Sequence, residues 1–402
     1  MEINVHEFFL ILFLILVSAK IFGELFAYLK LPSVLGEVFA GILIGPSFLH
    51  FVEPNQILKV LAEIGIILLL FEVGLETDVK KLKDSGVRSV IVAVVGAIIP
   101  FVFGYGVSHY FLELPILISL FIGGTLTATS IGITIRALKD IGKHRTSVAQ
   151  IVIGAAVIDD IIGVVLLVMI YDFVITGEIN LYTTGRILFL IAVFFTIAPV
   201  LANLISKLIH VYDRYLKKAD GFIPSSIIAL ILLFAYLSHL FGAPEILGAF
   251  TAGLALSRRF FLPFGISFQT DPQFLQRIEN NMRPIIQLFT PIFFVMVGVS
   301  INLRVIDITS YDFWVISIVL LIIAVIGKMA GAFLIKGMPD LKKTIIGVAM
   351  VPRGEVGLIF AELGRTTEIF NDELYAIMVF VIIITTIVPP LLLKWLFRLE
   401  EE

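Results

Sequence analysis

The chain has 402 residues, of which 59% are hydrophobic and only 15% are charged, with a formal net charge of −3 and no cysteine. About a quarter of the residues of a soluble domain are charged, so this composition excludes an ordinary soluble protein. It offers no basic surface for nucleic acid, and the lack of cysteine excludes disulfides and thiolate metal sites. The apolar residues form blocks of about 20 and do not alternate, which predicts an all-α polytopic membrane protein.

These blocks, separated by glycine, proline and charged residues, predict about thirteen transmembrane helices. The first has no basic region before it and is long for a signal peptide, so we expect it to be retained. The ninth is short, and the segment 259–275 that follows could lie at the membrane interface. In chain order the predicted helices cover 7–29, 33–50, 56–75, 87–110, 115–138, 146–172, 183–208, 221–241, 244–258, 276–301, 311–336, 341–364 and 370–397.

Lysine and arginine are distributed unevenly between the two sides of this topology. With the N-terminus outside, the inner loops collect most of the basic residues, whereas the outer side holds only Lys59, Arg186, Arg304 and Arg365. Short cytoplasmic loops retain positive charge. We therefore expect a multi-pass protein of the cell membrane with its N-terminus outside and its C-terminus in the cytoplasm.

Two parts of the sequence match each other in collinear order. Residues 32–41 and 244–253 share the pattern Pro-x-x-Leu-Gly-x-x-x-Ala-Gly at an offset of 212. Later matches, at offsets of 224 to 226, join Val73-Gly74 to Val297-Gly298, Gly132 to Gly357, and Asp159-Asp160 to Thr385-Thr386. Predicted helices two to six thereby map onto nine to thirteen. Because this shift is odd, the second copy is inverted in the membrane, as in secondary transporters.

Helix-weakening residues interrupt two predicted helices at matching positions of this repeat. Residues 123–132 bring glycine, threonine and serine into helix 115–138, and residues 351–357 bring Pro352, Arg353 and Glu355 into helix 341–364. Transporter folds build their ion sites at such broken helices near the membrane midplane. For the first stretch, close packing of small residues is the alternative explanation.

Asp159 and Asp160 lie within an apolar run that has no other charge between Arg145 and Asp172. A carboxylate in hydrocarbon costs several kcal/mol, so the pair should face the bundle interior or a water-filled cavity. A shielded carboxylate can hold either a proton or a hard cation, and this competition suffices for cation/proton exchange. Neighbouring residues on a helix point about 100° apart, so at most one of the two acids faces the ion squarely.

Lys328 falls deep inside an apolar run and therefore needs an acidic partner. We favour Asp159 as this partner, which leaves Asp160 as the principal cation ligand, but spacing alone leaves the opposite assignment open. The alternative to an ion-binding role is that the acids only form a structural ion pair with Lys328 or Arg353, which holds helices together. One such pair, however, needs only one acid, and here two are adjacent.

The sequence resembles the monovalent cation/proton antiporters, specifically the Na+/H+ antiporters of the NapA type, over nearly its whole length. The resemblance rests on the double aspartate with the downstream lysine and on four segments, which are 31–37, 70–77, 128–134 and 154–160. It implies a NhaA/NapA-like fold and a homodimer that transports Na+ or Li+ against H+ without a cofactor. It also implies elevator-like movement of a core domain (87–172 and 311–397) against a dimerisation domain (1–75 and 221–301), with 183–208 as a linker helix.

The same resemblance implies roles for individual residues. Asp160 is the expected cation and proton carrier, and Asp159 is expected to pair with Lys328 in the empty or protonated phase. Thr129 and Ser130 match family positions near the ion. Arg353 and Glu355 are expected charge partners at the second helix break. Relatives with two aspartates are electrogenic exchangers, so we expect the same of this chain.

Three other functions compete with this interpretation. A K+/H+ antiporter of the Kef type without a regulatory domain is the nearest alternative, because ion selectivity depends on cavity size and ligand number. A sodium-coupled organic-anion symporter would not need the acid pair and the membrane lysine. An intramembrane aspartyl protease needs aspartates from two helices aimed at one water. No Gly-x-x-x-x-Gly-Lys-Ser/Thr motif supports ATP use.

Overall fold

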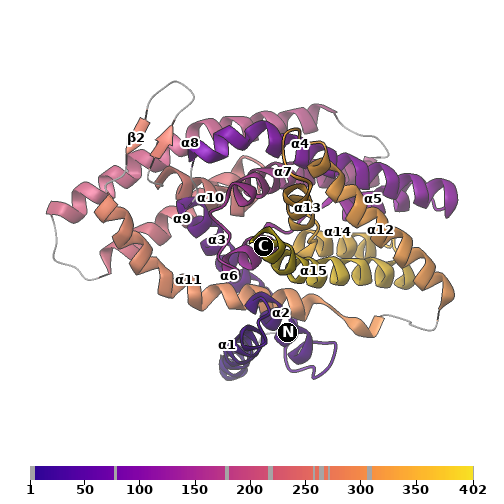
Figure 1. Cartoon of the computed structure of the whole chain (residues 1–402). Coiled ribbons are helices and arrows are strands. Elements are labelled where there is room, and N and C mark those ends of the chain that lie inside the picture. Colours follow the sequence, from indigo (N-terminus) through magenta and orange to yellow (C-terminus); the bar gives the residue numbers. More distant parts are fainter. Residues whose placement is uncertain are drawn as a thin grey trace. The chain divides into compact units, whose positions relative to one another are not determined.

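The structure is a computed structural model that describes residues 5–76, 79–176, 181–215, 221–256, 259–261, 267–269, 272–305 and 310–401. Apart from one small hairpin, its elements are helices (Figure 1). A π-helical turn, η1 (Val107–Phe111), follows α4, and a 3-10 turn, η2 (Leu303–Val305), follows α11. The α-helices are α1 (Val5–Tyr28), α2 (Ser33–Ile44), α3 (Gln56–Glu76), α4 (Val79–Gly106), α5 (Ile116–Thr127), α6 (Ile131–Asp140), α7 (Ser147–Thr176), α8 (Leu181–Tyr215), α9 (Phe222–Leu240), α10 (Glu245–Leu256), α11 (Pro272–Ser300), α12 (Tyr311–Phe333), α13 (Asp340–Ala349), α14 (Gly354–Thr366) and α15 (Asp372–Glu401).

Nine helical stretches among the described residues are long and apolar enough to cross a membrane. Two shorter apolar helices, α2 and α10, accompany them. Such a set of apolar helices is characteristic of a multi-pass membrane protein. The strands β1 (Arg259–Phe261) and β2 (Ser267–Gln269) pair antiparallel, with Phe260 opposite Phe268. The sequence pattern does not predict these strands, although aromatic residues favour strands.

Helix α2 is shorter than the sequence analysis predicts. We expected a helix over 33–50, but α2 ends at Ile44 and Gly45 adopts an extended backbone. The cause is Pro46, because a proline disfavours helical geometry in the residue before it and has no N–H for the helix. The apolar residues after Gly45 made the sequence look helical beyond this stop.

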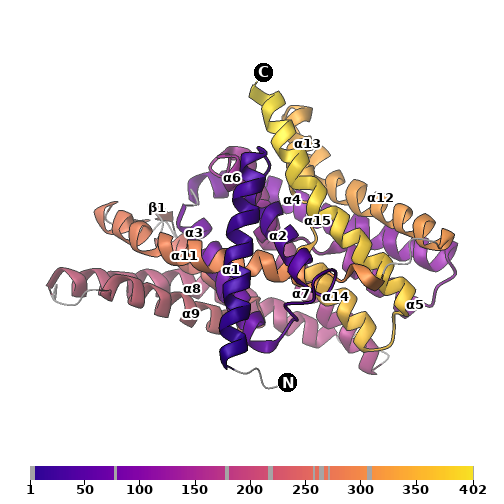
Figure 2. The same cartoon turned by 90° about the horizontal axis from the view of Figure 1, so that it is seen from below.

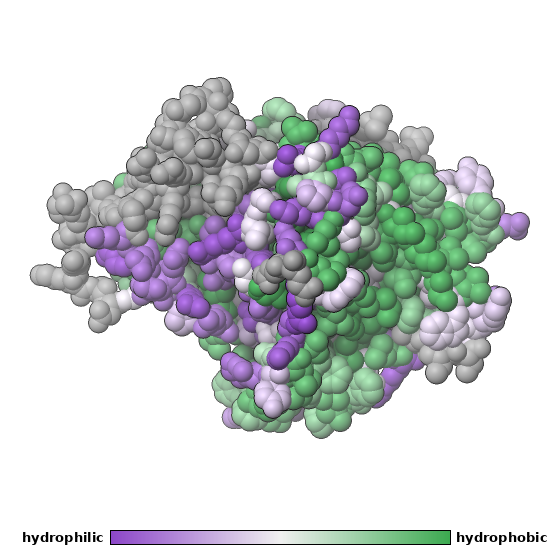
Figure 3. Space-filling view, viewed as in Figure 1, coloured by the Kyte–Doolittle hydropathy of each residue, from purple (hydrophilic) through white to green (hydrophobic). Residues whose placement is uncertain are grey.

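Helix α12 shows how the spans divide their surface between protein and lipid. The exposed side chains Val315, Ile318, Ile322 and Ile326 recur at helical spacing along one face. The other face buries mostly small or polar residues, among them Lys328, together with Phe313 and Leu320. Figure 3 shows a broad hydrophobic surface in the region where Figure 1 places α12. An apolar exposed face over a polar interior is the pattern of a helix that faces lipid.

The described helices form two compact units, which we describe separately. The first comprises residues 1–59, 86–179 and 294–402, and the second comprises 60–85 and 180–293. In the first unit α12 packs beside α13 and α15, as both views show (Figures 1 and 2). In the second unit, parts of α3, α8, α9, α10 and α11 enclose an apolar core that includes Phe71, Phe234 and Phe274.

Glycines of the two repeat motifs make equivalent contacts inside these units. In the first unit, a Cβ on Gly36 would collide with the carbonyl oxygen of Phe22, and in the second unit a Cβ on Gly248 would collide with that of Phe234. The two glycines are 212 residues apart, and so are Phe22 and Phe234; this is the offset of the sequence motif. The shared sequence pattern therefore encodes the same close approach of two helices in each copy.

A second pair of contacts repeats in the same way. A Cβ on Gly41 would collide with the carbonyl oxygen of Val295, and a Cβ on Gly253 would collide with that of Phe71. The glycines again differ by 212, and their partners differ by 224, as the later matches of the repeat do.

Candidate functional site

The helical path through α5 and α6 is interrupted in the middle. Helix α5 ends at Thr127, Ala128 and Ser130 have extended backbones, and α6 starts at Ile131. The Thr127 hydroxyl donates a hydrogen bond to the carbonyl oxygen of Gly123 at 2.9 Å. Such a side-chain bond competes with the backbone hydrogen bonds of the helix. The interruption leaves carbonyl oxygens at the end of α5 and N–H groups at the start of α6 without helical partners.

A matching interruption separates α13 from α14. Helix α13 ends at Ala349, and α14 starts at Gly354 after the buried residues Met350 to Arg353. Pro352 lies inside this stretch and cannot donate a helical hydrogen bond.

Hydrogen bonds join the two interruptions directly. The N–H of Ser130 donates to the carbonyl of Pro352 at 2.8 Å, and the Thr129 hydroxyl donates to the carbonyl of Met350 at 3.2 Å. The Thr134 hydroxyl, one turn further along α6, donates to the carbonyl of Ala349 at 2.7 Å. Thr129 and Ser130 are 3% and 0% exposed. Several of the polar groups released by one break are therefore satisfied by groups of the other break, away from solvent.

Gly354 is the point where only a glycine fits. Its φ is +47°, and a Cβ there would lie 2.6 Å from both Cβ and Oγ of Ser130. Left-handed backbone geometry strains any residue with a side chain, and here the neighbouring break also occupies the space.

We expect Gly354→Ala to destabilise this crossing. The left-handed backbone costs about 1–2 kcal/mol by itself, and displacing Ser130 adds to that cost. Thermal unfolding of the purified variant in detergent measures the loss. Gly142→Ala is the matched control, because Gly142 also has a positive φ of +70° but no atom lies within 4 Å of its missing Cβ. Equal destabilisation of the two variants would show that contact with Ser130 contributes nothing.

Asp159 and Lys328 form a buried ion pair in the same unit. The Lys328 ammonium lies 2.5 Å from Oδ1 of Asp159, and the side chains are 0% and 1% exposed. The same ammonium donates to the carbonyl of Thr127 at 2.7 Å. Lys328 therefore joins α12 to α7 and to the released carboxyl end of α5, where a positive charge also interacts favourably with the helix dipole.

Asp160 is the next residue of α7 and is 7% exposed, compared with 2% for Asp159. Because neighbouring residues of a helix point about 100° apart, its carboxylate faces a different direction from the carboxylate that Lys328 holds. Two buried acids on one helical turn thus have different surroundings.

Arg353 contacts backbone carbonyls of two other elements. Its guanidinium donates from Nη1 to Ala128 at 3.1 Å and from Nη2 to Ala324 at 2.9 Å, and the residue is 0% exposed. It thereby ties the α13–α14 break to the α5–α6 break and to α12. The sequence predicts both Arg353 and Glu355 as charge partners at the second break. The side chain of Glu355 lies outside the described part of the structure.

Three threonines at this crossing were not selected as site residues from the sequence. Thr127 supplies the carbonyl for Lys328, Thr134 bonds the opposite break, and the hydroxyl of Thr386 accepts the N–H of Gly354 at 3.3 Å. The sequence repeat could have indicated Thr386, because it aligns Thr386 with Asp160. Nothing in the local sequence distinguishes Thr134 from a threonine that packs in an ordinary helix.

Comparison with known proteins agrees with this architecture. A family model described as the transmembrane sodium/hydrogen exchanger matches residues 10–399. The chain is 35% identical to the Na(+)/H(+)-K(+) antiporter GerN of Bacillus cereus, with 98% of each chain covered. It is 32% identical to the high-affinity Na(+)/H(+) antiporter NhaS3 of Synechocystis, covering 95% of this chain and 88% of that one.

A solved structure shares the fold. The sodium proton antiporter MjNhaP1 of Methanocaldococcus jannaschii aligns with a TM-score of 0.73 at 16% identity, covering 100% of this chain and 99% of the other. At that identity the likeness concerns the fold alone. The family model and the two bacterial relatives, however, cover nearly the whole chain. The chain is therefore a multi-pass membrane protein that belongs to the sodium/hydrogen exchanger family of monovalent cation/proton antiporters.

Proposed function

We propose that the chain is a secondary-active Na+/H+ antiporter that exchanges Na+ or Li+ for protons by alternating access, with Asp160 as the carrier and Asp159–Lys328 as a coupled pair. The observation that carries this proposal is the placement of the Lys328 ammonium 2.5 Å from Asp159 and 2.7 Å from the Thr127 carbonyl. A site that holds an ammonium between a carboxylate and a carbonyl already has the oxygen ligands that a hard cation prefers.

The crossing of the two breaks supplies the rest of this site. Thr129 and Ser130 lie at the start of α6 beside the released backbone groups, so they are our candidate neutral ligands for the ion. Arg353, bonded to Ala128, adds a fixed positive charge near the acids. Two carboxylates and two cations allow the site to take up one alkali cation or protons without accumulating a large buried charge.

The repeat supports placing Asp160 at the ion. The N–H of Gly354, at the start of α14, donates to Thr386, and the repeat pairs Thr386 with Asp160. By this correspondence we propose that Asp160 lies near the start of α6, as Thr386 lies near the start of α14. An acidic side chain in that position adds a charge that can be neutralised by a proton or by Na+.

We further propose the complete architecture that this mechanism requires. It comprises about thirteen transmembrane helices, with an inverted repeat that contains the two broken helices. The equivalent glycine contacts of Gly36 and Gly248, and of Gly41 and Gly253, support this repeat. We place the N-terminus outside and the C-terminus in the cytoplasm, in accordance with the distribution of basic loops.

The moving parts follow from the same proposal. A core domain, formed by 87–172 and 311–397, carries the acids and both breaks. It would move against a dimerisation domain, 1–75 and 221–301, within a homodimer, with 183–208 as linker. Exchange would be electrogenic, because two acids can release two protons for each Na+. All of the contacts that we assign to the ion site lie within the core residues.

K+/H+ exchange is the alternative that one observation favours, since the name of the relative GerN includes K+ beside Na+. An ion-competition assay in proteoliposomes separates the two. With a pH-sensitive dye inside, we expect Na+ and Li+ to drive proton movement at concentrations where K+ drives little. Exchange driven by K+ alone would establish the alternative, and no cation-driven proton movement would refute both.

A further inference from the structure

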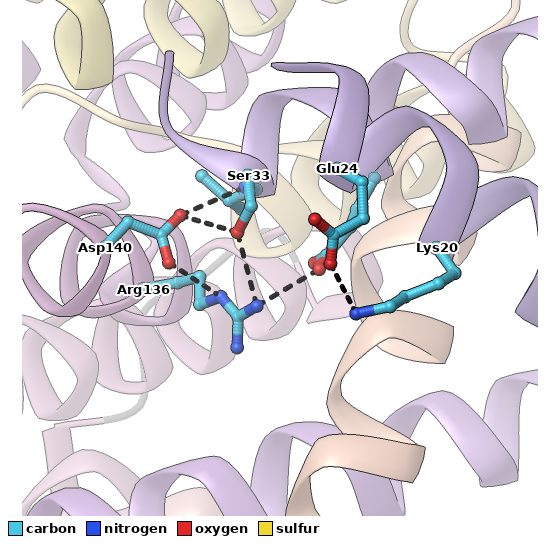
Figure 4. A network of polar contacts seen from close by, with 7 residues as sticks. Lys20, Glu24, Ser33, Arg136 and Asp140 are labelled. Carbon is cyan, nitrogen blue, oxygen red and sulfur yellow. Dashed lines mark hydrogen bonds and ion pairs between the residues drawn. The ribbon is translucent and has the colours of Figure 1, made fainter. Parts of the chain in front are cut away.

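A second charged cluster lies on the second half of α6, where this helix meets α2, which in turn packs against α1. The carboxylate Oε1 of Glu37 lies 3.1 Å from Nη2 of Arg136, and Nε of Arg136 lies 3.3 Å from Oδ1 of Asp140. Ser33 donates its hydroxyl to Oδ2 of Asp140 at 2.8 Å and accepts from Arg136 at 3.3 Å. Figure 4 shows Arg136 reaching between Asp140 and Ser33, with Lys20 and Glu24 of α1 beside them.

Glu37 differs from the other acids of this cluster because it is buried and incompletely bonded. The residue is 4% exposed, and its side chain lies against Gly23 of α1. Its second oxygen, Oε2, is buried and has no hydrogen-bond partner in the structure. A buried charged oxygen without a hydrogen bond is costly, whereas the protonated carboxyl group carries no net charge.

In the directly bonded group, the carboxylates of Glu37 and Asp140 share the one guanidinium of Arg136, which leaves one excess negative charge. From α1, Lys20 and Glu24 form their own pair at 2.6 Å and are largely exposed. From α6, Arg136 must serve both Glu37 and Asp140. From α15, Lys394 acts on Asp140 over a longer distance. Protonation of Glu37 would leave Arg136 paired with Asp140 alone and would neutralise this directly bonded group.

We propose that Glu37 is a second proton-binding site, separate from Asp159 and Asp160, and that its ion pair with Arg136 is a latch between α2 and α6. The ionised carboxylate holds the latch closed, and a proton on Glu37 opens it. Arg136 lies six residues after Ser130 along α6, so about 9 Å of helix separate the latch from the helix break that holds Ser130. Release of one end of α6 therefore acts on the element that carries the ion site.

The repeat explains why this latch would act on one side of the membrane only. The offsets of 212 and 225 pair Glu37 with Ala249 and Arg136 with Ala361, so neither partner of the latch has a charged counterpart. In an inverted repeat, a contact without a counterpart favours one of the two facing states over the other. This coupling to transport rests on the proposed function, whereas the proton site does not.

The proton site can be tested in a protein that does not transport. In an Asp160→Asn background, which leaves the buried Asp159–Lys328 pair intact, infrared difference spectra between about pH 5 and pH 9 should show a carboxyl C=O band that disappears in Glu37→Gln. Glu24→Gln, which removes an exposed carboxyl group of the same cluster, should leave the band unchanged. Arg136→Gln should move the band to higher pH, because the guanidinium stabilises the ionised form. A band that persists in Glu37→Gln, or no band in that range, would overturn the proton site.

The latch is tested by the pH profile of Na+-driven exchange in the transport-competent protein. Glu37→Gln should retain exchange but lose the part of the profile that coincides with the infrared transition, a change of about two- to fivefold in rate for one partly exposed ion pair. Glu24→Gln should keep the original profile. If the infrared band belongs to Glu37 but the profile of Glu37→Gln is unchanged, the latch is refuted while the proton site and the exchange function stand.

Discussion

Replacement of Asp160 by asparagine should abolish Na+-driven proton movement in proteoliposomes. The substitution keeps the size and the buried position of the side chain, which is 7% exposed, but removes the only charge that this position can exchange between a proton and Na+. A neutral amide cannot bind a proton in this range and is a weaker ligand for a hard cation. We expect the rate to fall by at least about 100-fold, because loss of several kcal/mol of ion binding corresponds to two or more powers of ten.

The matched control for this variant is Asp312→Asn. Asp312 lies in the first turn of α12 and is exposed, so the same chemical change there should leave exchange nearly unchanged. Exchange at the wild-type rate in Asp160→Asn, with the variant folded in the membrane, would show that another group carries the ion.

Replacement of Lys328 by methionine should strongly destabilise the protein. The ammonium is 0% exposed and bonds both Asp159 and Thr127, so its removal leaves a buried carboxylate and a released carbonyl without a partner. Removal of one partner of a buried ion pair costs about 3–5 kcal/mol. Thermal unfolding in detergent should therefore show a large decrease in melting temperature, whereas Lys336→Met, at an exposed position, should show little.

The double variant Lys328→Met/Asp159→Asn distinguishes the pair from a general effect on packing. Because it removes both charges together, most of the lost stability should return. If the double variant is as unstable as Lys328→Met, the ion pair is not the source of the effect.

The sequence predicted the helical architecture because its signals are local. Blocks of apolar residues define spans, and Gly-Thr-Ser and Val-Pro-Arg-Gly stretches weaken helices wherever they occur. The end of α2 was misplaced because apolar residues continue past Gly45, and here the conformational effect of Pro46 outweighed hydropathy. The small β1–β2 hairpin was missed because three-residue strands have no periodic signal.

The charged residues of the candidate site could be predicted from the sequence, but the backbone carbonyls that bind them could not. A buried lysine needs an acid, so a pair of Lys328 with one of the two aspartates could be predicted, with Asp159 favoured and Asp160 left open. The structure places Lys328 against Asp159. The carbonyls of Thr127, Ala128 and Ala324 that Lys328 and Arg353 bind could not be predicted, since every residue has a carbonyl and only the crossing of the breaks selects these three. Glu37 could not be recognised as a proton site from the sequence, because its partner Arg136 is 99 residues away along the chain.

Proton release on Na+ binding is the most direct test of competition between protons and alkali cations at the acid pair. Addition of NaCl to the purified protein in weakly buffered detergent solution should acidify the medium, and choline chloride at equal concentration should not. The Asp159→Asn/Asp160→Asn variant should release no protons under the same conditions. Release of protons by this variant at the wild-type level, or Na+ binding by the wild type without any proton release, would contradict the account.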